Sequence, residues 1–115
     1  TVRMALLGHL DHLEQRSGEE LLLLELNHHA LRTPALRELA TEQYRGYYDG
    51  IQQLLVGMAE QTGVRWRVGP EQVARLAVTL TDGLTTTWLA DRDSAAARET
   101  IETIAEMVAG LAAPA

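Results

Sequence analysis

The sequence contains no cysteine, no phenylalanine and no lysine, so that all ten of its Lys and Arg residues are arginines. Without cysteine the chain forms neither disulfide bonds nor thiolate metal sites, which is compatible with a reducing cytoplasm. No apolar run approaches the roughly 18 residues that span a bilayer, because Glu25 directly follows the run Leu21 to Leu24. The N-terminus also lacks the basic and apolar regions of a signal peptide. We therefore expect a cytoplasmic protein without membrane contact.

Positive charge is also scarce, since the formal net charge is −6 at pH 7. The arginines are scattered singly between Arg3 and Arg98 rather than grouped. Binding to nucleic acid requires a surplus of basic residues on one face. The length of 115 residues is that of one domain with its own core. We expect a single domain over residues 1–115 that does not itself bind DNA.

The first two predicted helices cover about residues 2–14 and the segment from Ser17 to Leu31. Ser17 and Glu20 have the S-x-x-E spacing of a capping box, which predicts the start of the second helix. Leucines at 21–24 and 26 surround more than one face of that helix. We therefore expect the second helix to be buried on most sides.

A long third helix is predicted to begin at Thr33–Pro34, an N-cap followed by proline, and to end at Gly63. Residues 64–68 alternate as a short strand would, but no partner strand is evident, so we interpret them as a connector.

The fourth helix is predicted to begin at Gly69–Pro70, and the fifth is capped by Asp93 and ended by Gly110 and Pro114. Five helices with short connections predict an all-α, five-helix bundle.

Enzyme motifs are absent: there is no phosphate-binding glycine loop, no G-x-S-x-G and no H-E-x-x-H. We expect no catalytic residues and no cofactor. The best metal candidates are His9 and His12, three residues apart, and the Glu-x-x-His pair Glu25 and His28. Di-iron bundles need that pair twice, so we expect no metal. A metal- or ligand-binding bundle protein or enzyme that uses these four residues is the alternative.

Two groups of polar residues could face a cavity. Tyr44, Tyr47 and Tyr48 cluster on the third helix, where their hydroxyls could orient a ligand in a cavity between helices or simply fill the edge of the core. A filled core without a cavity would make the chain purely a dimerisation module. The threonines at 85–87 would more commonly return hydrogen bonds to the preceding helical turn than face a ligand.

The last two helices carry apolar or small residues outside their main stripes, namely Ala74, Val78, Gly83, Leu89, Ala96, Met107 and Ala112. A second apolar face on each of two adjacent helices favours self-association around a two-fold axis, which would form a four-helix bundle from two chains. The alternative is a helix pair buried more centrally within one chain.

Two stretches resemble the C-terminal regulatory domain of TetR-family transcription repressors. The run from His29 to Arg37 resembles the A-x-R-x-P-x-L-R junction before the long pocket helix of that family. The stretch from Gly69 to Asp91, with Asp82-Gly83-Leu84 at its centre, resembles the family's penultimate helix. The resemblance covers roughly the whole chain.

This resemblance implies a bacterial, cytoplasmic repressor whose last two helices form a homodimer and whose earlier helices enclose a pocket for a small apolar or aromatic effector. The N-terminal helix-turn-helix headpiece of the family is absent from these residues, so DNA binding would occur only through it. Resemblance and helical geometry together give the ligand-binding candidates His28, Tyr44, Tyr47, Tyr48, Ile51, Leu55, Thr87 and Trp88. The dimer candidates are Ala77, Leu80, Leu84, Ile101, Ile104, Met107, Val108 and Leu111.

Overall fold

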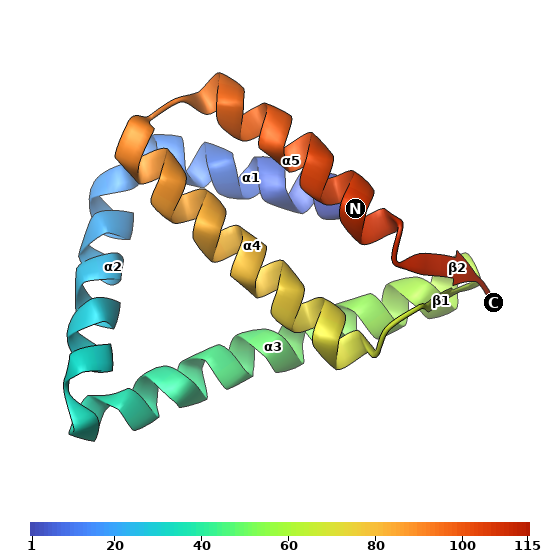
Figure 1. Ribbon diagram of the computed structural model, residues 1–115, viewed down its shortest axis with the longest axis horizontal. Coiled ribbons are helices and arrows are strands. Elements are labelled where there is room, and N and C mark those ends of the chain that lie inside the picture. The colour runs from blue at the N-terminus through green and yellow to red at the C-terminus, as the bar shows by residue number, and fades with distance from the viewer.

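The computed structural model describes residues 1–115 and contains five helices and one two-stranded sheet. The elements are α1 (Val2–Gln15), α2 (Ser17–Arg32), α3 (Pro34–Thr62), β1 (Val64–Trp66), α4 (Pro70–Asp91), α5 (Ser94–Ala109) and β2 (Ala112–Pro114). The all-α class is confirmed. Helices α1, α2 and α3 form the sides of a triangle that α4 crosses (Figure 1).

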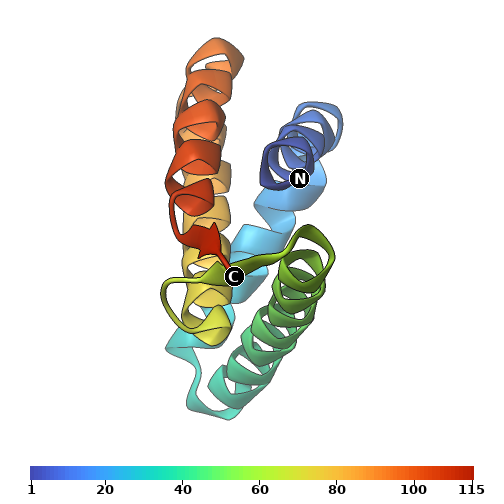
Figure 2. The same ribbon diagram turned by 90° about the vertical axis from the view of Figure 1, so that its right-hand side faces the viewer.

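The molecule is flat, with extents of 43 × 36 × 17 Å. Seen from the side, α4 and α5 form one layer and α1 to α3 form another (Figure 2). The main core lies where α1, α4 and α5 meet, and its most deeply buried side chains include Leu10, Leu13, Val73, Ile101 and Val108. One side of the α4–α5 layer therefore packs on the core.

Several predicted helix ends are confirmed. Helix α3 begins at Pro34, directly after Thr33, and ends before Gly63, whose φ of 69° is the left-handed conformation that glycine adopts most easily. The Asp93 side chain accepts a hydrogen bond of 3.0 Å from the Ala96 backbone N–H at the start of α5. These ends are set by local chemistry, which explains why local sequence signals located them.

The predicted capping box is wrong. Ser17 is already the first residue of α2, and no side chain caps this helix. Because only Arg16 separates α1 from α2, Ser17 has no room to take the non-helical backbone of an N-cap. The Glu20 carboxylate instead lies 3.1 Å from Nε2 of His12, so this pair joins the two helices at their shared corner.

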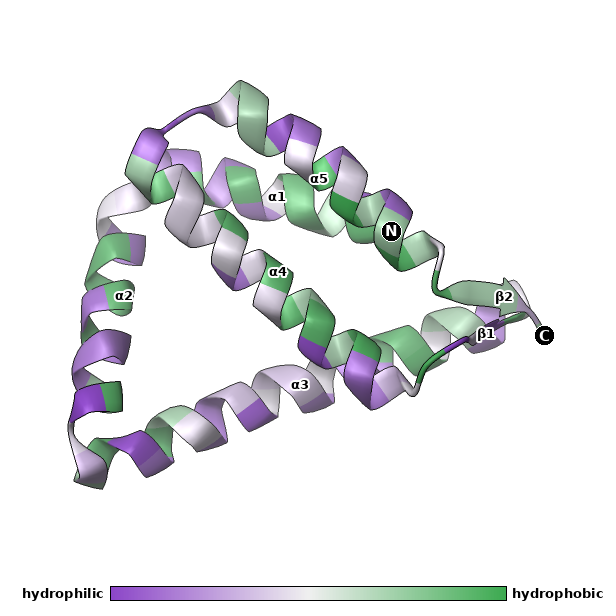
Figure 3. Ribbon diagram, viewed as in Figure 1, coloured by the Kyte–Doolittle hydropathy of each residue, from purple (hydrophilic) through white to green (hydrophobic).

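The expectation that α2 is buried on most sides is also wrong, because none of its residues is buried. Its main neighbours are α3 and α1, while α4 and α5 pack elsewhere. Hydrophobic residues recur along α2 as they do along the other helices (Figure 3). Leu22 and Leu23 nevertheless remain 56% and 57% exposed. Leucine content shows that a helix has apolar surface, but not that another helix covers it.

The interpretation of residues 64–68 as a plain connector is corrected as well. Strand β1 pairs antiparallel with β2 in the register Val64 with Pro114 and Trp66 with Ala112. The partner strand lies about 50 residues further along the chain, at a segment that resembled only a helix end. The Trp66 indole N–H also donates to the Leu55 carbonyl over 3.1 Å. The sheet therefore fastens the C-terminal residues to the end of α3.

Candidate functional site

A concavity of about 910 Å³ lies inside the helical frame, between α2, α3 and α4, with His9 of α1 at its edge. Drug-sized ligands occupy pockets of roughly 300–1,000 Å³, so this space is large enough for one. The lining residues come mainly from α2, α3 and α4, and Figure 1 shows α2 and α3 meeting at the lower left, away from α4.

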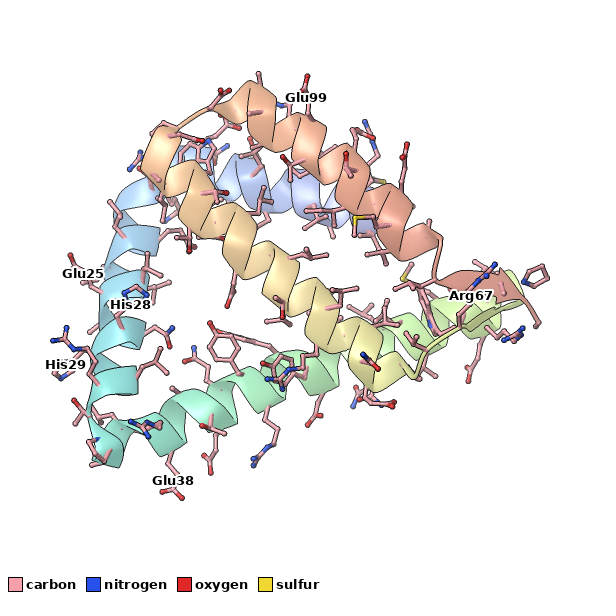
Figure 4. The ribbon with its side chains drawn as sticks, viewed as in Figure 1. Glu25, His28, His29, Glu38, Arg67 and Glu99 are labelled. Atoms are coloured by element: carbon pink, nitrogen blue, oxygen red, sulfur yellow. The ribbon has the colours of Figure 1, made fainter.

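The structure brings half of the predicted ligand-binding residues to this concavity. His28, Tyr44, Tyr47 and Ile51 line it. Figure 4 shows Glu25 and His29 pointing away from the frame on the outer side of α2. His28 thus differs from its neighbour His29 because the two occupy different faces of one helix.

The other four predicted residues lie elsewhere. Leu55 and Trp88 belong to the core, and the Trp88 indole N–H donates to Ser94 Oγ over 3.0 Å. The Tyr48 ring lies under the Arg75 guanidinium at 5.1 Å. The Thr87 hydroxyl donates to the Gly83 carbonyl over 2.9 Å, as expected for threonine within a helix. Each of these side chains already has a partner within the chain.

One polar contact crosses the concavity between α3 and α4. The Tyr44 hydroxyl donates to Oδ2 of Asp82 over 2.6 Å. Burial and this hydrogen bond to a carboxylate raise the pKa of Tyr44 to about 12. Sequence reasoning missed Asp82, although it stands in the Asp-Gly-Leu motif that supported the family resemblance. Acidic residues on a helix most often face solvent, so the motif alone did not indicate a pocket.

A second polar contact joins α1 to α4. Nε2 of His9 lies 2.7 Å from Oγ1 of Thr85, whose hydroxyl donates to the Thr81 carbonyl over 3.0 Å. Because that hydroxyl proton is already committed, Oγ1 accepts and Nε2 of His9 carries the hydrogen. Burial lowers the pKa of His9, so its ring is neutral at pH 7. His9 was predicted only as a metal candidate, and its place at the concavity became visible only in the fold.

The rest of the wall is apolar. Leu23 and Leu26 of α2 line the concavity together with Leu39 of α3. Their exposed fractions are 57%, 57% and 62%. Exposed apolar side chains grouped in a hollow are typical of binding sites. The concavity therefore combines a leucine wall with a few polar groups.

The alternative metal-binding interpretation finds no support. No group of three or more His, Asp or Glu residues is placed to hold a metal ion. The four candidates lie in different surroundings: His9 bonds Thr85, His12 pairs with Glu20, Glu25 points outward, and His28 lines the concavity. Metal ions in proteins need several ligands at one point.

The predicted dimer residues fall at different depths. Leu84, Ile101, Ile104 and Val108 are buried within one chain, so a second chain could reach them only if the helices separated. Leu80 and Leu111 pack against that core and Ala77 is half-buried. Met107 alone is exposed, at 55%. These positions lie mainly beneath the surface of α4 and α5 rather than on it.

A different set of residues faces outward on the α4–α5 layer. On α4 it is Gln72, Leu76, Thr79, Gly83, Thr86 and Ala90, and on α5 it is Ala96, Thr100, Thr103 and Met107. Thr86 stands at the edge of this row, because it also lines the concavity. Steps of four and three residues alternate in both rows, which keeps each row on one side of its helix. None of these residues is charged, and all except the half-buried Leu76 are exposed. We call these two rows the outer stripe.

Comparison with known proteins decides the family. The sequence profile of a family described as BetI-type transcriptional repressor, C-terminal, matches residues 1–113. The chain belongs to this family. The predicted resemblance to the C-terminal domain of TetR-family repressors is thereby confirmed, and the chain is a transcription regulator domain of a non-enzymatic family.

Other comparisons add nothing to the family assignment. No curated protein and no solved structure matches the chain. Within this BetI-type domain no helix has the length and apolarity needed to cross a membrane.

Proposed function

We propose that this BetI-type domain binds a small-molecule effector in the concavity and forms a homodimer through the outer stripe. Effector binding would thereby control DNA binding by a helix-turn-helix headpiece at its N-terminal side, in the bacterial cytoplasm. One observation carries the proposal: α4 contributes both to the wall of the concavity and to the outer stripe. A single helix therefore touches both proposed sites.

The composition of the outer stripe supports the dimer. Its residues are mostly Gly, Ala and Thr, whose small side chains allow two helices to approach closely. Two-fold contact of α4 and α5 with the same helices of a second chain would form a four-helix bundle, with each stripe facing its own copy. Met107 would supply an adaptable apolar side chain at this contact.

The polar contacts of α4 support a link between the two sites. Asp82 and Thr85 connect α4 to Tyr44 of α3 and His9 of α1, while Gly83 lies on the outer side. An effector that changes either contact would change the position of α4 relative to the rest of the frame. Such an effector shifts the equilibrium only if its affinity differs between the two dimer geometries.

Native mass spectrometry of the purified chain tests the dimer directly. Each chain has a mass of 12.7 kDa, and we expect twice this mass to persist on dilution to low micromolar concentration. A monomer that retains its helical circular dichroism would overturn the dimer.

A further inference from the structure

We propose that α1 and α5 move as one rigid unit, which carries the geometry of the dimer to the start of α1, where the headpiece would connect. The positioning residues of this unit are Arg3 and Glu14 on α1 and Arg98 and Glu102 on α5. This inference rests on the proposed homodimer and names the path from its interface to the headpiece. Three features carry it: ion pairs near both ends of α1, a buried row of leucines between them, and a cap on the first turn of α1.

Ion pairs join α1 to α5 near both ends of α1. Near the N-terminal end, Nε of Arg3 lies 2.6 Å from Oε1 of Glu102. Near the other end, Nη2 of Arg98 lies 3.3 Å from Oε1 of Glu14, and the second oxygen of this carboxylate accepts a hydrogen bond of 3.2 Å from Ser94 Oγ. The helical rise places the two α1 residues about 16 Å apart along the axis. Two contacts at this spacing oppose both sliding and rotation of α1 on α5.

Buried side chains fill the space between the two ion pairs. Helix α1 lies beside α5 (Figure 1), and its Leu6, Leu10 and Leu13 are buried in the core together with Ile101 and Ile104 of α5. Apolar burial holds two helices together but has no preferred direction. Charged hydrogen bonds do have a preferred geometry. The core therefore keeps α1 on α5, and the ion pairs set its register.

The unit extends from the outer stripe to the start of α1. The Thr1 hydroxyl oxygen accepts a hydrogen bond of 3.2 Å from the Met4 backbone N–H, so α1 is capped at its first turn. On α5, Thr100 and Thr103 belong to the outer stripe, whereas Glu102 pairs with α1. Both contacts are thus made by one helix of about 10 Å diameter. A change in the angle between the two α5 helices of a dimer would therefore reach the start of α1 directly.

Helix α2 provides a weaker connection. None of its residues is buried, and only Arg16 and Thr33 separate it from α1 and α3. Its side-chain contacts with preceding residues are those of Glu20 with His12 and of Glu19 with Arg16. These contacts lie at one corner and do not reach α5. We therefore expect α2 to change its orientation more freely than α1 does.

Double electron–electron resonance tests the rigid unit in the full chain. Because the sequence has no cysteine, one introduced cysteine per chain takes a single nitroxide label, and a homodimer then gives one distance between its two labels. Ala5→Cys labels α1 and Glu25→Cys labels α2, both at exposed positions. We expect a narrower distance distribution for Ala5→Cys than for Glu25→Cys. Equal widths would overturn the rigid unit, whereas loss of the dipolar signal at both positions would overturn the homodimer itself.

Charge reversal tests the positioning residues. Arg3→Glu combined with Arg98→Glu places two carboxylates together at each end of α1, and we expect the narrow distribution at Ala5→Cys to be lost. Adding Glu14→Arg and Glu102→Arg restores opposite charges and should restore the narrow distribution. An unchanged distribution in the first variant, or a broadening that the second does not reverse, would overturn the role of these ion pairs.

Arg16→Glu is the matched control. The ion pair of Arg16 with Glu19 is also at least half exposed, but it does not involve α5. We expect this variant to keep the narrow distribution at Ala5→Cys, and equal broadening here would overturn the specific role of the α1–α5 pairs. Exposed ion pairs contribute little to stability, so helical circular dichroism and the urea midpoint should change little in all variants. A broadened distribution in a chain of unchanged stability is a result that a merely structural role would not give.

Discussion

We expect replacement of Gly83 by arginine to prevent dimerisation without destabilising the fold of the single chain. Gly83 lies within α4, is exposed, and a Cβ atom built on it meets nothing within 4 Å in one chain. A larger side chain therefore causes no clash inside the monomer. Because glycine is a poor helix former, arginine here should favour the folded chain by about 0.7 kcal/mol.

Across a two-fold dimer the same change would act twice, since each chain brings its own residue 83 to the outer stripe. Taking an unpaired charge out of water costs several kcal/mol per ion. Even about 3 kcal/mol in total would weaken dimerisation more than about a hundredfold. The loss concerns association, whereas the gain in helix propensity concerns the folding of each chain. The variant should therefore be folded and monomeric.

Sedimentation equilibrium measures the association, and far-ultraviolet circular dichroism measures the fold. Gly8→Arg is the matched control, because Gly8 is also exposed within a helix and its Cβ would also meet nothing within 4 Å, but it lies on α1. We expect Gly83→Arg to be monomeric and Gly8→Arg to remain dimeric, with equal helical content. If Gly83→Arg dimerised as tightly as the unaltered chain, the outer stripe would not be the interface.

Three further predictions follow from the contacts within one chain. In an ultraviolet pH titration, the Tyr44 phenol should ionise near its raised pKa of about 12, and Asp82→Asn should lower that value toward 10. Because the pKa of Tyr44 in the folded chain exceeds the ordinary pKa of tyrosine, the stabilisation by Tyr44 is complete below pH 10 and is lost as the pH rises toward 12. Ionisation of all three tyrosines in a single step would contradict the contact between Tyr44 and Asp82. Leu23→Arg should abolish calorimetric binding of 1-octanol, an apolar probe of the leucine wall, while the equally exposed Leu22→Arg, outside the concavity, retains it. Equal loss in both variants would place the ligand elsewhere. The Ile101 side chain has no exposed surface, so Ile101→Ala should lower the free energy of unfolding in urea by about 2–5 kcal/mol. The same loss should occur in the monomeric Gly83→Arg variant. A loss seen only in the dimer would place Ile101 at the interface.

The parts of the fold that the sequence predicted are those set by neighbouring residues. Proline at the start of α3, Gly63 after its end and the Asp93 cap of α5 act within one helical turn. The pairing of β1 with β2 depends instead on residues about 50 positions apart. A strand of three residues shows too little alternation of apolar and polar side chains for its distant partner to be predicted from the sequence.

The site was harder to predict because the burial of an apolar residue depends on which other helix packs against it. Leu22, Leu23 and Leu26 form one continuous apolar pattern, yet Leu23 and Leu26 line the concavity and Leu22 does not. The tyrosines show the same limit. Tyr44 and Tyr47 face the concavity, while Tyr48, one residue further on, faces Arg75. Helical periodicity groups residues by face, but only the neighbouring helices decide what each face meets.

Helix α4 shows why one stretch of sequence supported several interpretations at once. Its Val73, Ala74 and Leu84 pack into the core, Asp82 and Thr85 face the concavity, and Thr79 and Gly83 belong to the outer stripe. Consecutive residues of a helix differ by about 100° in direction, so residues 82 to 85 meet a ligand space, an outer surface and the core within one turn. In the proposed mechanism a ligand that moves Asp82 necessarily moves Gly83, because both are fixed to the same rigid backbone. The transmission of an effector signal to the dimer then requires no chain of intermediate side chains.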